Sequence, residues 1–577
     1  MAQTQLLDIS GGLQTATTWQ MKQPNEIYDA ENMRFDQEIG GAERRLGYTL
    51  VKSFSDTYPL GCFPAEFSTG DYIFHAYNNS RTNPTATVLS YYDPFTGTST
   101  VVKNDYPKNC KLSFVMNSDE LYVAGITTDT GSRQTLLNVT KEFVVSTSRN
   151  LYGAPKAALI GENSGALYAM NVELNGVVYP DRAYISSSQR GAITYINSAI
   201  TASPTVKLDS ARYIKVGMVL DIYGAGTGYR KYSNVTVTAV NNSTDTITLS
   251  TAITALKTDE LWLAGRFGDG SSNLLWNTDY RDPQTADFLF IASGKTASTA
   301  ISGWGSSNNR MMIFTTSSLW QYDNANFIPI FKDIGCISND TICNNGTFII
   351  WLDATGKVRA RDSNSGQDQI ISRAIKNQYL ENLSATNLSQ ASAVMYDGNY
   401  KLSVGTITIG GVPTISRFIY NFDMNIWWRE AHTRRQVFSF VSNFNGTSLC
   451  YFLDELGNLW LDESGNLDGS DTIPWFVQYG RRNLGVSQIK TLSGLYVFAS
   501  NLSHASSAAF MVKLPGVDSS WNTLGQLTGP ISAIEIPDTS PIEGRDFDFK
   551  ISGNSKGDPA KIEGIEVWSH VQQSNFS

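Results

Sequence analysis

Two stretches of this chain, a hundred positions apart, share one pattern: NGTFIIWLDATGKVRARD at Asn345–Asp362 and NGTSLCYFLDELGNLWLD at Asn445–Asp462. Each opens with Asn-Gly, which favours the two positive φ angles of a type I′ turn. An apolar run follows, then an Asp-x-x-Gly turn in which Asp can bond its own backbone, then a second apolar run. The shared order of turn, strand, turn and strand predicts an antiparallel meander in both places.

The meander has a regular spacing. Asp323 and Asp362 close successive apolar runs 39 positions apart, and Asp423 and Asp462 repeat that interval. Four-stranded units that recur about every 40 to 45 residues are typical of β-propeller blades. The alternative is an ordinary meander in one large sandwich. The two equal intervals favour a propeller of six or seven blades.

The composition indicates an all-β protein. Among 577 residues, aromatic residues make up 11%, charged residues only 17%, and glycine is frequent at 47 residues. Short β-rich runs alternate with polar turns, and long helical periodicities are nearly absent. The formal net charge of −9 gives no sign of electrostatic capture of nucleic acid or of an acidic membrane.

The expected compartment follows from the start of the chain and from its cysteines. Met1–Gln5 carries no basic segment and leads into no apolar run, so we expect no secretory signal. No apolar run approaches the ~20 residues that span a bilayer. The cysteines are odd in number and lack C-x-x-C spacing, which favours reduced core residues made in a cytosol over disulfides or a zinc site: Cys62, Cys110, Cys336, Cys343 and Cys450.

The turn and strand signals divide the chain into five parts: an N-terminal arm or platform at 1–54, propeller segments at 55–200 and 266–471, an inserted small β-barrel at 201–265, and a C-terminal β-sandwich at 472–577. The insertion is richer in Thr and Val and has its own turns. We expect the arm and the sandwich to pack together, because both lie outside the repeat and flank it.

One amphipathic helix is expected within the second propeller segment. In Arg373–Ser384, the apolar residues Ile375, Tyr379, Leu380 and Leu383 fall near one helical face.

Residues with catalytic potential do not converge in the sequence. His75, His432, His504 and His570 are scattered, and no nucleophile elbow, P-loop or H-E-x-x-H motif occurs. The pairs Asp454/Glu455 and Asp462/Glu463 could serve a glycosidase, but both are placed in turns, where solvated carboxylates are common. The sequence therefore predicts no enzyme, no catalytic residues and no cofactor.

A calcium site is the one metal alternative. Oxygen-bearing residues alternate around Gly366 and around Gly465, as they do in some Ca²⁺ loops. Neither set contains a bidentate Glu, so turn chemistry is favoured over a metal for both: Asp362, Asn364 and Asp368 in the first, and Asp462, Ser464, Asn466 and Asp468 in the second.

Basic residues form no stripe. The doublets Arg44-Arg45, Arg434-Arg435 and Arg481-Arg482 are isolated and are not interleaved with aromatic residues. Solvated or salt-bridged arginines are therefore favoured over nucleic-acid readers.

Three phrases resemble one family. They are GGL with NEIYDAENMRFDQEIGGAERRLGY near the start, VYPDRAYIS at Val178–Ser186, and GRDFDFKISG at Gly544–Gly553. Together they are similar to the tail nozzle proteins of short-tailed bacteriophages, also called packaged-DNA stabilisation or tail tubular B-type proteins. The likeness spans most of the chain, and the insertion at 201–265 departs from the family's minimal pattern.

The resemblance implies a propeller with a platform and a structural role in the virion. It implies a homohexameric ring at the tail end that retains packaged DNA and lets it out at infection. Its partners would be a tail adaptor, tail fibres or spikes, and double-stranded DNA that passes without sequence-specific binding. The alternative is a glycan-binding or glycan-cleaving tail protein that uses the propeller or the inserted domain. A carboxylate pair in a Trp-lined groove would favour that alternative, but the twelve tryptophans, including Trp427-Trp428, do not cluster.

Overall fold

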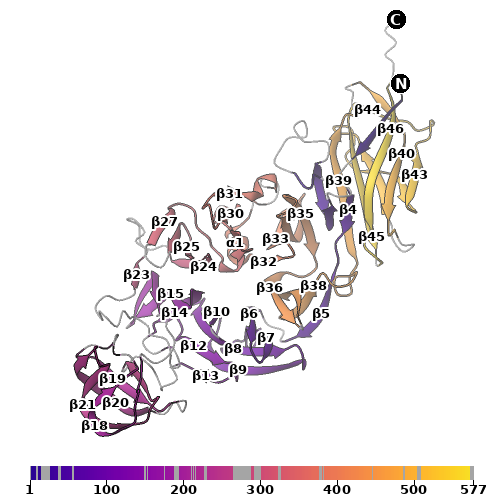
Figure 1. The fold of residues 1–577 in the computed structure, drawn as a ribbon. Coiled ribbons are helices and arrows are strands. Elements are labelled where there is room, and N and C mark those ends of the chain that lie inside the picture. The colour runs from indigo at the N-terminus through magenta and orange to yellow at the C-terminus, as the bar shows by residue number, and fades with distance from the viewer. Residues whose placement is uncertain are drawn as a thin grey trace. The chain divides into compact units, whose positions relative to one another are not determined.

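The computed structural model is all-β and consists almost entirely of antiparallel sheets (Figure 1). The residues that it describes are 2–7, 11–14, 26–36, 41–54, 58–117, 119–147, 151, 154–174, 176–186, 194–209, 211, 214, 216–225, 230–263, 288–290, 300–308, 310–322, 327–375, 380, 383–444, 446–484, 488–502, 508–555 and 557–571. The chain divides into two compact units, one of Met1–Pro59 with Cys336–Ser577 and one of Leu60–Gly335.

Four four-stranded sheets lie in the second unit. Each joins its strands in the order in which they occur in the chain: β6(Pro59–Phe67), β7(Gly70–Asn78), β8(Ala86–Asp93), β9(Thr98–Pro107); β10(Cys110–Asn117), β11(Glu120–Thr127), β12(Leu137–Thr140), β13(Val145–Ser146); β14(Lys156–Asn163), β15(Ala166–Leu174), β16(Val177–Ile185), β23(Phe288–Phe290); and β24(Ile301–Ser307), β25(Arg310–Thr315), β26(Leu319–Tyr322), β27(Phe327–Phe331).

The insertion predicted at 201–265 forms a six-stranded sheet with its own core, but the sheet begins earlier than predicted, at Thr194, because the strand that starts there pairs with the last strand of the insertion. Its strands are ordered β17(Thr194–Tyr195), β22(Glu260–Leu263), β19(Val219–Tyr223), β20(Arg230–Asn241), β21(Thr246–Ala255) and β18(Ile200–Lys207). Fifteen buried apolar residues between Ile196 and Leu261 pack together inside it. The first and last strands, β17 and β22, pair with each other, so the chain enters and leaves this sheet at one place.

Three further four-stranded sheets lie in the first unit: β28(Cys343–Asn344), β29(Phe348–Leu352), β30(Val358–Asp362), β31(Asp368–Ile370); β32(Ser392–Tyr396), β33(Asn399–Ile409), β34(Val412–Asn421), β35(Ile426–His432); and β36(Gln436–Phe444), β37(Thr447–Asp454), β38(Asn458–Asp462), β5(Tyr48–Ser53). The twin stretches take equivalent places, as expected. Each begins at the turn between the first and second strands of its sheet and supplies the second and third strands.

Strand β5 corrects the predicted boundary of the arm. The sequence assigns Tyr48–Ser53 to a platform, but this strand pairs with β38 and completes a four-stranded sheet more than 400 positions away. The local sequence of an edge strand carries no mark of its partner, so this pairing was not predictable.

The N-terminal and C-terminal strands share two sheets. One is ordered β3(Met33–Asp36), β4(Gly41–Arg44), β46(Lys561–Val571), β40(Lys490–Ser500), β43(Ile531–Glu535), with β1(Ala2–Leu7) on β46 and β44(Ile542–Gly544) on β40. The other is ordered β2(Ile27–Glu31), β39(Ile473–Arg482), β45(Phe547–Ser555), β41(Ala508–Lys513), β42(Asn522–Leu527).

A single apolar core joins these two sheets, and it includes Trp475, Phe510, Phe549 and Ile565. In Figure 1 the indigo N-terminal strand β4 lies beside the yellow strand β46. The arm and the C-terminal segment therefore pack together, and the sandwich is built from both of them.

The first Asn-Gly turn differs from the predicted type I′. Gly346 has φ +89° and Thr347 follows it, while Asn345 is not among the residues with positive φ. The Asn345 N–H donates to the Phe348 carbonyl at 3.1 Å, so Asn345 ends the strand and Gly346 takes the first central position, as in a type II′ turn. In the second copy, Phe444 pairs with Thr447 across Gly446, and Asn445 lies outside the described residues.

Half of the helix predicted at Arg373–Ser384 lies outside the described residues, and its described ends differ from the prediction. A 3₁₀ turn, η3(Ile371–Ile375), ends where the helix was expected to start, and α1(Ala385–Gln390) begins where it was expected to end. Residues 376–379 and 381–382 lie outside the described residues. The Ser384 hydroxyl accepts from the Asn387 N–H at 3.1 Å, so Ser384 caps a helix that follows it. Another short 3₁₀ turn, η2(Asn339–Thr341), precedes β28.

Candidate functional site

The densest buried charge of the described residues lies between the sheet of β32–β35 and strand β38. Lys401 (β33), Arg417 (β34), Glu430 (β35) and Asp462 (β38) are all at most 3% exposed. Asp462 accepts from Lys401 Nζ at 3.0 Å and from Arg417 Nη1 at 2.8 Å. Arg417 Nη2 also donates to Glu430 at 2.5 Å. Each charge therefore has an opposite charge in contact, as buried ions require.

The N-terminal arm extends this network. Arg34 (β3) donates to Glu463 at 2.7 Å and lies 3.7 Å from Glu430. Glu463 also contacts Lys401. Residues from the arm, from two four-stranded sheets and from the loop after β38 are thus joined by charge-assisted hydrogen bonds, which are stronger than neutral ones. We call the set Arg34, Lys401, Arg417, Glu430, Asp462 and Glu463 the ion-pair network.

A second buried centre lies beside it at Asn32 and Arg45. Asn32 has φ +59° and its side-chain oxygen accepts from Arg45 Nε and from the Ala431 N–H, both at 2.8 Å. Its amide nitrogen donates to the Pro474 carbonyl at 2.7 Å. The Asn32 side chain thereby connects the arm to β35 and to β39.

The cations of the ion-pair network keep its buried carboxyl groups ionised. Burial by itself raises the pKa of the Asp462 carboxyl, but the Arg417 and Lys401 cations outweigh it and hold that pKa well below its usual range. Burial likewise raises the pKa of Glu430, and Arg417 together with the His432 hydrogen bond brings it well below normal. Burial, assisted by Arg45 and Arg417, lowers the pKa of His432 to about 4. A carboxyl with a lowered pKa is a poor general acid at neutral pH.

Three of the four carboxylates suggested for glycoside cleavage are engaged by protein donors. Asp462 and Glu463 belong to the ion-pair network. Asp454 is buried, and its carboxylate accepts from the N–H groups of Leu456 and Asn458 at 2.9 Å and from Trp460 Nε1 at 2.9 Å. In the twin stretch Asp353 accepts equivalently from Thr355, Lys357 and Arg359.

The candidate calcium ligands are also engaged by protein donors. Asp362 accepts from the Asn364 and Ser365 N–H groups at 2.7 and 2.8 Å, and these bonds lower its pKa. Asp368 pairs with Arg359 at 2.9 Å, and Asp468 pairs with Arg45. Within the described part of the chain, no group of three His, Cys, Asp or Glu residues is arranged to hold a metal ion.

The basic doublets are largely turned inward. Arg44 and Arg45 are each 1% exposed. Arg44 donates to the carbonyls of Asn466 and Gly557, and Arg482 donates to the Glu26 carbonyl at 2.9 Å. Arg435 lies 6.0 Å from the Tyr58 ring centroid. Of these arginines, Arg45 forms a salt bridge, with Asp468, while Arg44 and Arg482 donate to backbone carbonyls.

The remaining candidates are dispersed. Trp427 donates to the Ile371 carbonyl at 2.8 Å, and Trp428 is buried on the opposite face of β35 in a different core, so the two rings line no common groove. Burial lowers the pKa of His75 to about 3, His570 is exposed, and His504 lies outside the described residues. All five cysteines are free.

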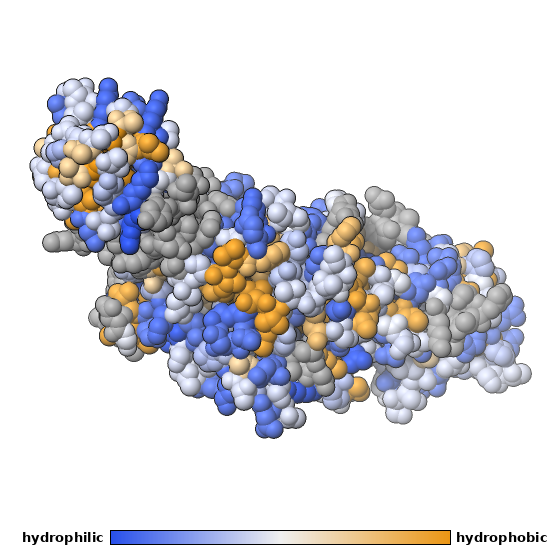
Figure 2. All heavy atoms as spheres, turned by 90° about the horizontal axis from the view of Figure 1, so that it is seen from below, coloured by the Kyte–Doolittle hydropathy of each residue, from blue (hydrophilic) through white to orange (hydrophobic). Residues whose placement is uncertain are grey.

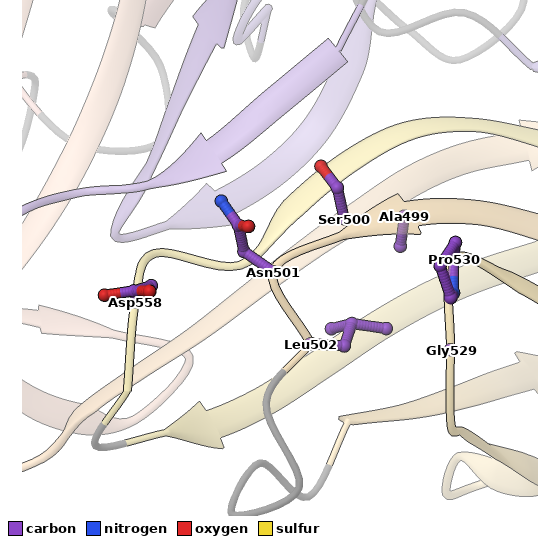
Figure 3. Close-up of a pocket in the computed structure, with 7 residues that line it drawn as sticks. All are labelled: Ala499, Ser500, Asn501, Leu502, Gly529, Pro530 and Asp558. Carbon is purple, nitrogen blue, oxygen red and sulfur yellow. The ribbon is translucent and has the colours of Figure 1, made fainter.

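Two surface hollows occur in the sandwich. One, of about 180 Å³, is lined by Ala499, Ser500, Asn501, Leu502, Gly529, Pro530 and Asp558 (Figure 3). Its only charged lining residue among those described, Asp558, contacts the Asn466 amide at 3.3 Å. The other, of about 560 Å³, lies over β40 and β43. Figure 2 shows one face of the molecule, on which apolar patches alternate with hydrophilic residues.

Sequence reasoning missed Lys401, Arg417 and Glu430. Each is a single charged residue within a β-rich run, as in Ile415-Ser416-Arg417-Phe418-Ile419. A charge in an otherwise apolar strand is a signal of a buried ion pair, because such a charge is rarely buried without a partner. Its partner, however, lies on another strand.

Comparison with known proteins adds little. No family model and no curated protein matches the chain. Among solved structures, one described as "Crystal Structure of Mitotic Checkpoint Complex" is similar at 8% identity and a TM-score of 0.33, over 73% of this chain and 93% of that chain. Likeness at this level carries no argument about function. No helix among the described residues is long and apolar enough to cross a membrane.

Proposed function

We propose that this chain is a structural protein whose seven four-stranded sheets form one closed β-propeller. The observation that carries the proposal is the pairing of β5 with β38. In this pairing a strand from the N-terminal side completes the last sheet, and the chain then continues directly into β6 of the first. When a strand from the start of the chain completes the last blade, hydrogen bonds between the two chain ends hold the ring of blades closed.

The chemistry of the buried charges supports a structural role. The carboxylates that a hydrolase would need are held in ion pairs or turn hydrogen bonds, and the arginines that could meet phosphates are bonded to backbone carbonyls. A network of this kind restricts the motion of the elements it joins, which suits a protein that bears mechanical load.

We further propose that the protein is a tail nozzle of a short-tailed bacteriophage. Support comes from the resemblance and from the use that the structure makes of its first phrase. Within that phrase Asn32, Arg34, Arg44 and Arg45 connect the arm to the sheets. In this proposal several copies, six by resemblance, form a ring in the virion. The ring meets a tail adaptor and fibres or spikes, retains the packaged double-stranded DNA and lets it pass into the host.

DNA would pass this ring without being gripped. The net charge of −9 is repeated in every copy, and a wall that bound phosphates would slow ejection. Retention would then depend on a steric constriction.

Two measurements test the proposal. The native mass of the purified protein, with projection images, should show a ring with an axial hole. A monomer at every concentration would contradict the ring. Binding of duplex DNA should be weak at low salt. Tight binding that falls steeply as salt rises would instead indicate a nucleic-acid-binding protein.

A further inference from the structure

The larger hollow on the sandwich lies around Gly494, which is one of the eleven described residues that line it. Gly494 (β40) pairs with Trp568 (β46) on one side and with Glu535 (β43) on the other. Because side chains alternate between the faces of a strand, these three residues share the outward face, opposite buried Leu495, Val567 and Ile534. Gly494 places no side chain on this face, and all three residues line a hollow of about 560 Å³.

An aromatic corner forms one wall. The Trp568 and Tyr496 rings meet edge to face, with centroids 4.9 Å apart and planes at 75°. Trp568 Nε1 donates to Glu566 at 2.8 Å, which fixes the orientation of the indole. Even so, Trp568 stays 39% exposed, so a large and oriented aromatic surface is open to a ligand.

The charge of the hollow is negative. Glu535 and Asp538 are the charged residues that line it among those described, and both are exposed. Glu566, held by Trp568, adds a third carboxylate beside the aromatic corner. An acidic rim around an aromatic wall is complementary to a cation, because the face of an aromatic ring attracts positive charge.

We propose that this hollow binds an arginine side chain presented by a protein partner. A planar guanidinium can stack on an indole while it donates to carboxylates at its edge. The same chain already places cations against aromatic rings: Lys550 Nζ lies 4.1 Å from the Phe476 centroid, and the Arg182 guanidinium lies 3.9 Å from that of Tyr179. A neutral sugar can also stack on the indole and donate its hydroxyls to the carboxylates, so the test below includes a glycoside. The negative charge of the hollow favours the cation.

The test uses the full chain labelled with 5-fluorotryptophan. The chain has twelve tryptophans, and the ¹⁹F signal of Trp568 is the one missing from Trp568→Phe. This signal is expected to shift saturably with N-acetyl-arginine N-methylamide and not with the citrulline analogue, which has nearly the same shape without the charge. The double variant Glu535→Gln/Asp538→Asn should weaken apparent affinity about tenfold, since each exposed charge contributes modestly. Glu563→Gln, an exposed carboxyl outside the hollow, is the matched control and should leave the affinity unchanged.

Three outcomes would overturn the inference. They are no shift with the arginine probe, equal shifts with both probes, or unchanged affinity in the double variant. A shift with methyl α-D-glucopyranoside but not with arginine would assign the hollow to a glycan. The inference does not depend on the proposed tail function, because the hollow lies within one sandwich and the probe is a small molecule.

Discussion

Arg45 and Asp468 form a two-point ion pair in which Nη1 and Nη2 donate to the two carboxylate oxygens at 2.7 and 2.6 Å. The two side chains are 1% and 3% exposed. They bind the N-terminal arm to the loop after β38, although 423 positions separate them. Substitutions of Arg45 and Asp468 therefore test how much this ion pair contributes to holding the arm in place.

We expect Arg45→Met to destabilise the first unit by about 3–5 kcal/mol, because it leaves the Asp468 carboxylate buried without a counter-ion. The measurement is the urea midpoint of the full chain, followed by tryptophan fluorescence. Arg45→Met combined with Asp468→Leu should cost less than Arg45→Met alone, since no charge then remains buried. Equal losses in the two variants would show that the pair itself does not account for the effect.

Stability should depend on His432 between about pH 6.5 and pH 4. The pKa of the His432 imidazole is about 6.5 in the unfolded chain, whereas in the folded protein burial lowers this pKa to about 4. The unfolded state therefore binds more protons in this window, so the free energy of unfolding falls as pH falls, by up to about 3 kcal/mol from this group. Above about pH 6.5 the contribution is fully present.

His432→Gln tests this dependence, because it removes the titration. The slope of stability against pH in that window should decrease, although not to zero. His75, in the other unit, has a pKa of about 3 and continues to contribute. An unchanged slope would contradict the assignment. The lowered pKa values of Asp462 and Glu430 act in the same direction, but only below the ordinary carboxyl range.

Gly47 should accept no side chain. A Cβ there would lie 1.8 Å from the Leu467 carbonyl oxygen and 2.3 Å from its carbon, both of them backbone atoms. We expect Gly47→Ala to displace the end of the arm from the loop after β38 and to lower the melting temperature by several degrees or more, as overpacking costs about 1–3 kcal/mol. Gly529→Ala is the control, because nothing lies within 4 Å of the added atom. A melting temperature of Gly47→Ala equal to that of Gly529→Ala would refute the contact.

The inserted domain should be removable. Thr194 pairs with Leu261 and Tyr195 with Glu260, so the two ends of the domain lie about 5 Å apart. Its buried core is confined to its own strands. Replacing 194–263 with a short Gly-Ser bridge should therefore leave a soluble protein with cooperative unfolding. The isolated fragment should also fold. Aggregation of the shortened chain would show that the insertion supports the rest.

The sequence by itself determined the local architecture. Asp-x-x-Gly turns and short apolar runs act over a few residues, so the meanders at 345–362 and 445–462 were predictable, as was the separate β-rich insertion. Where two local signals competed, prediction was less accurate. Ser384 was predicted to end a helix, yet it caps the helix that follows it. Gly346 accounts for the first turn without Asn345 taking a positive φ.

Only the tertiary structure decided which distant residues meet. Nothing in Tyr48–Ser53 singles out β38 as its partner, because the backbone hydrogen-bonding groups are the same on every strand and the side-chain pattern of six residues fits many partners. Lys401, Arg417, Glu430 and Asp462 lie on four different strands, and their spacing in sequence forms no motif. They converge because each buried charge requires an opposite charge in contact, and the packing of the sheets determines which one is within reach.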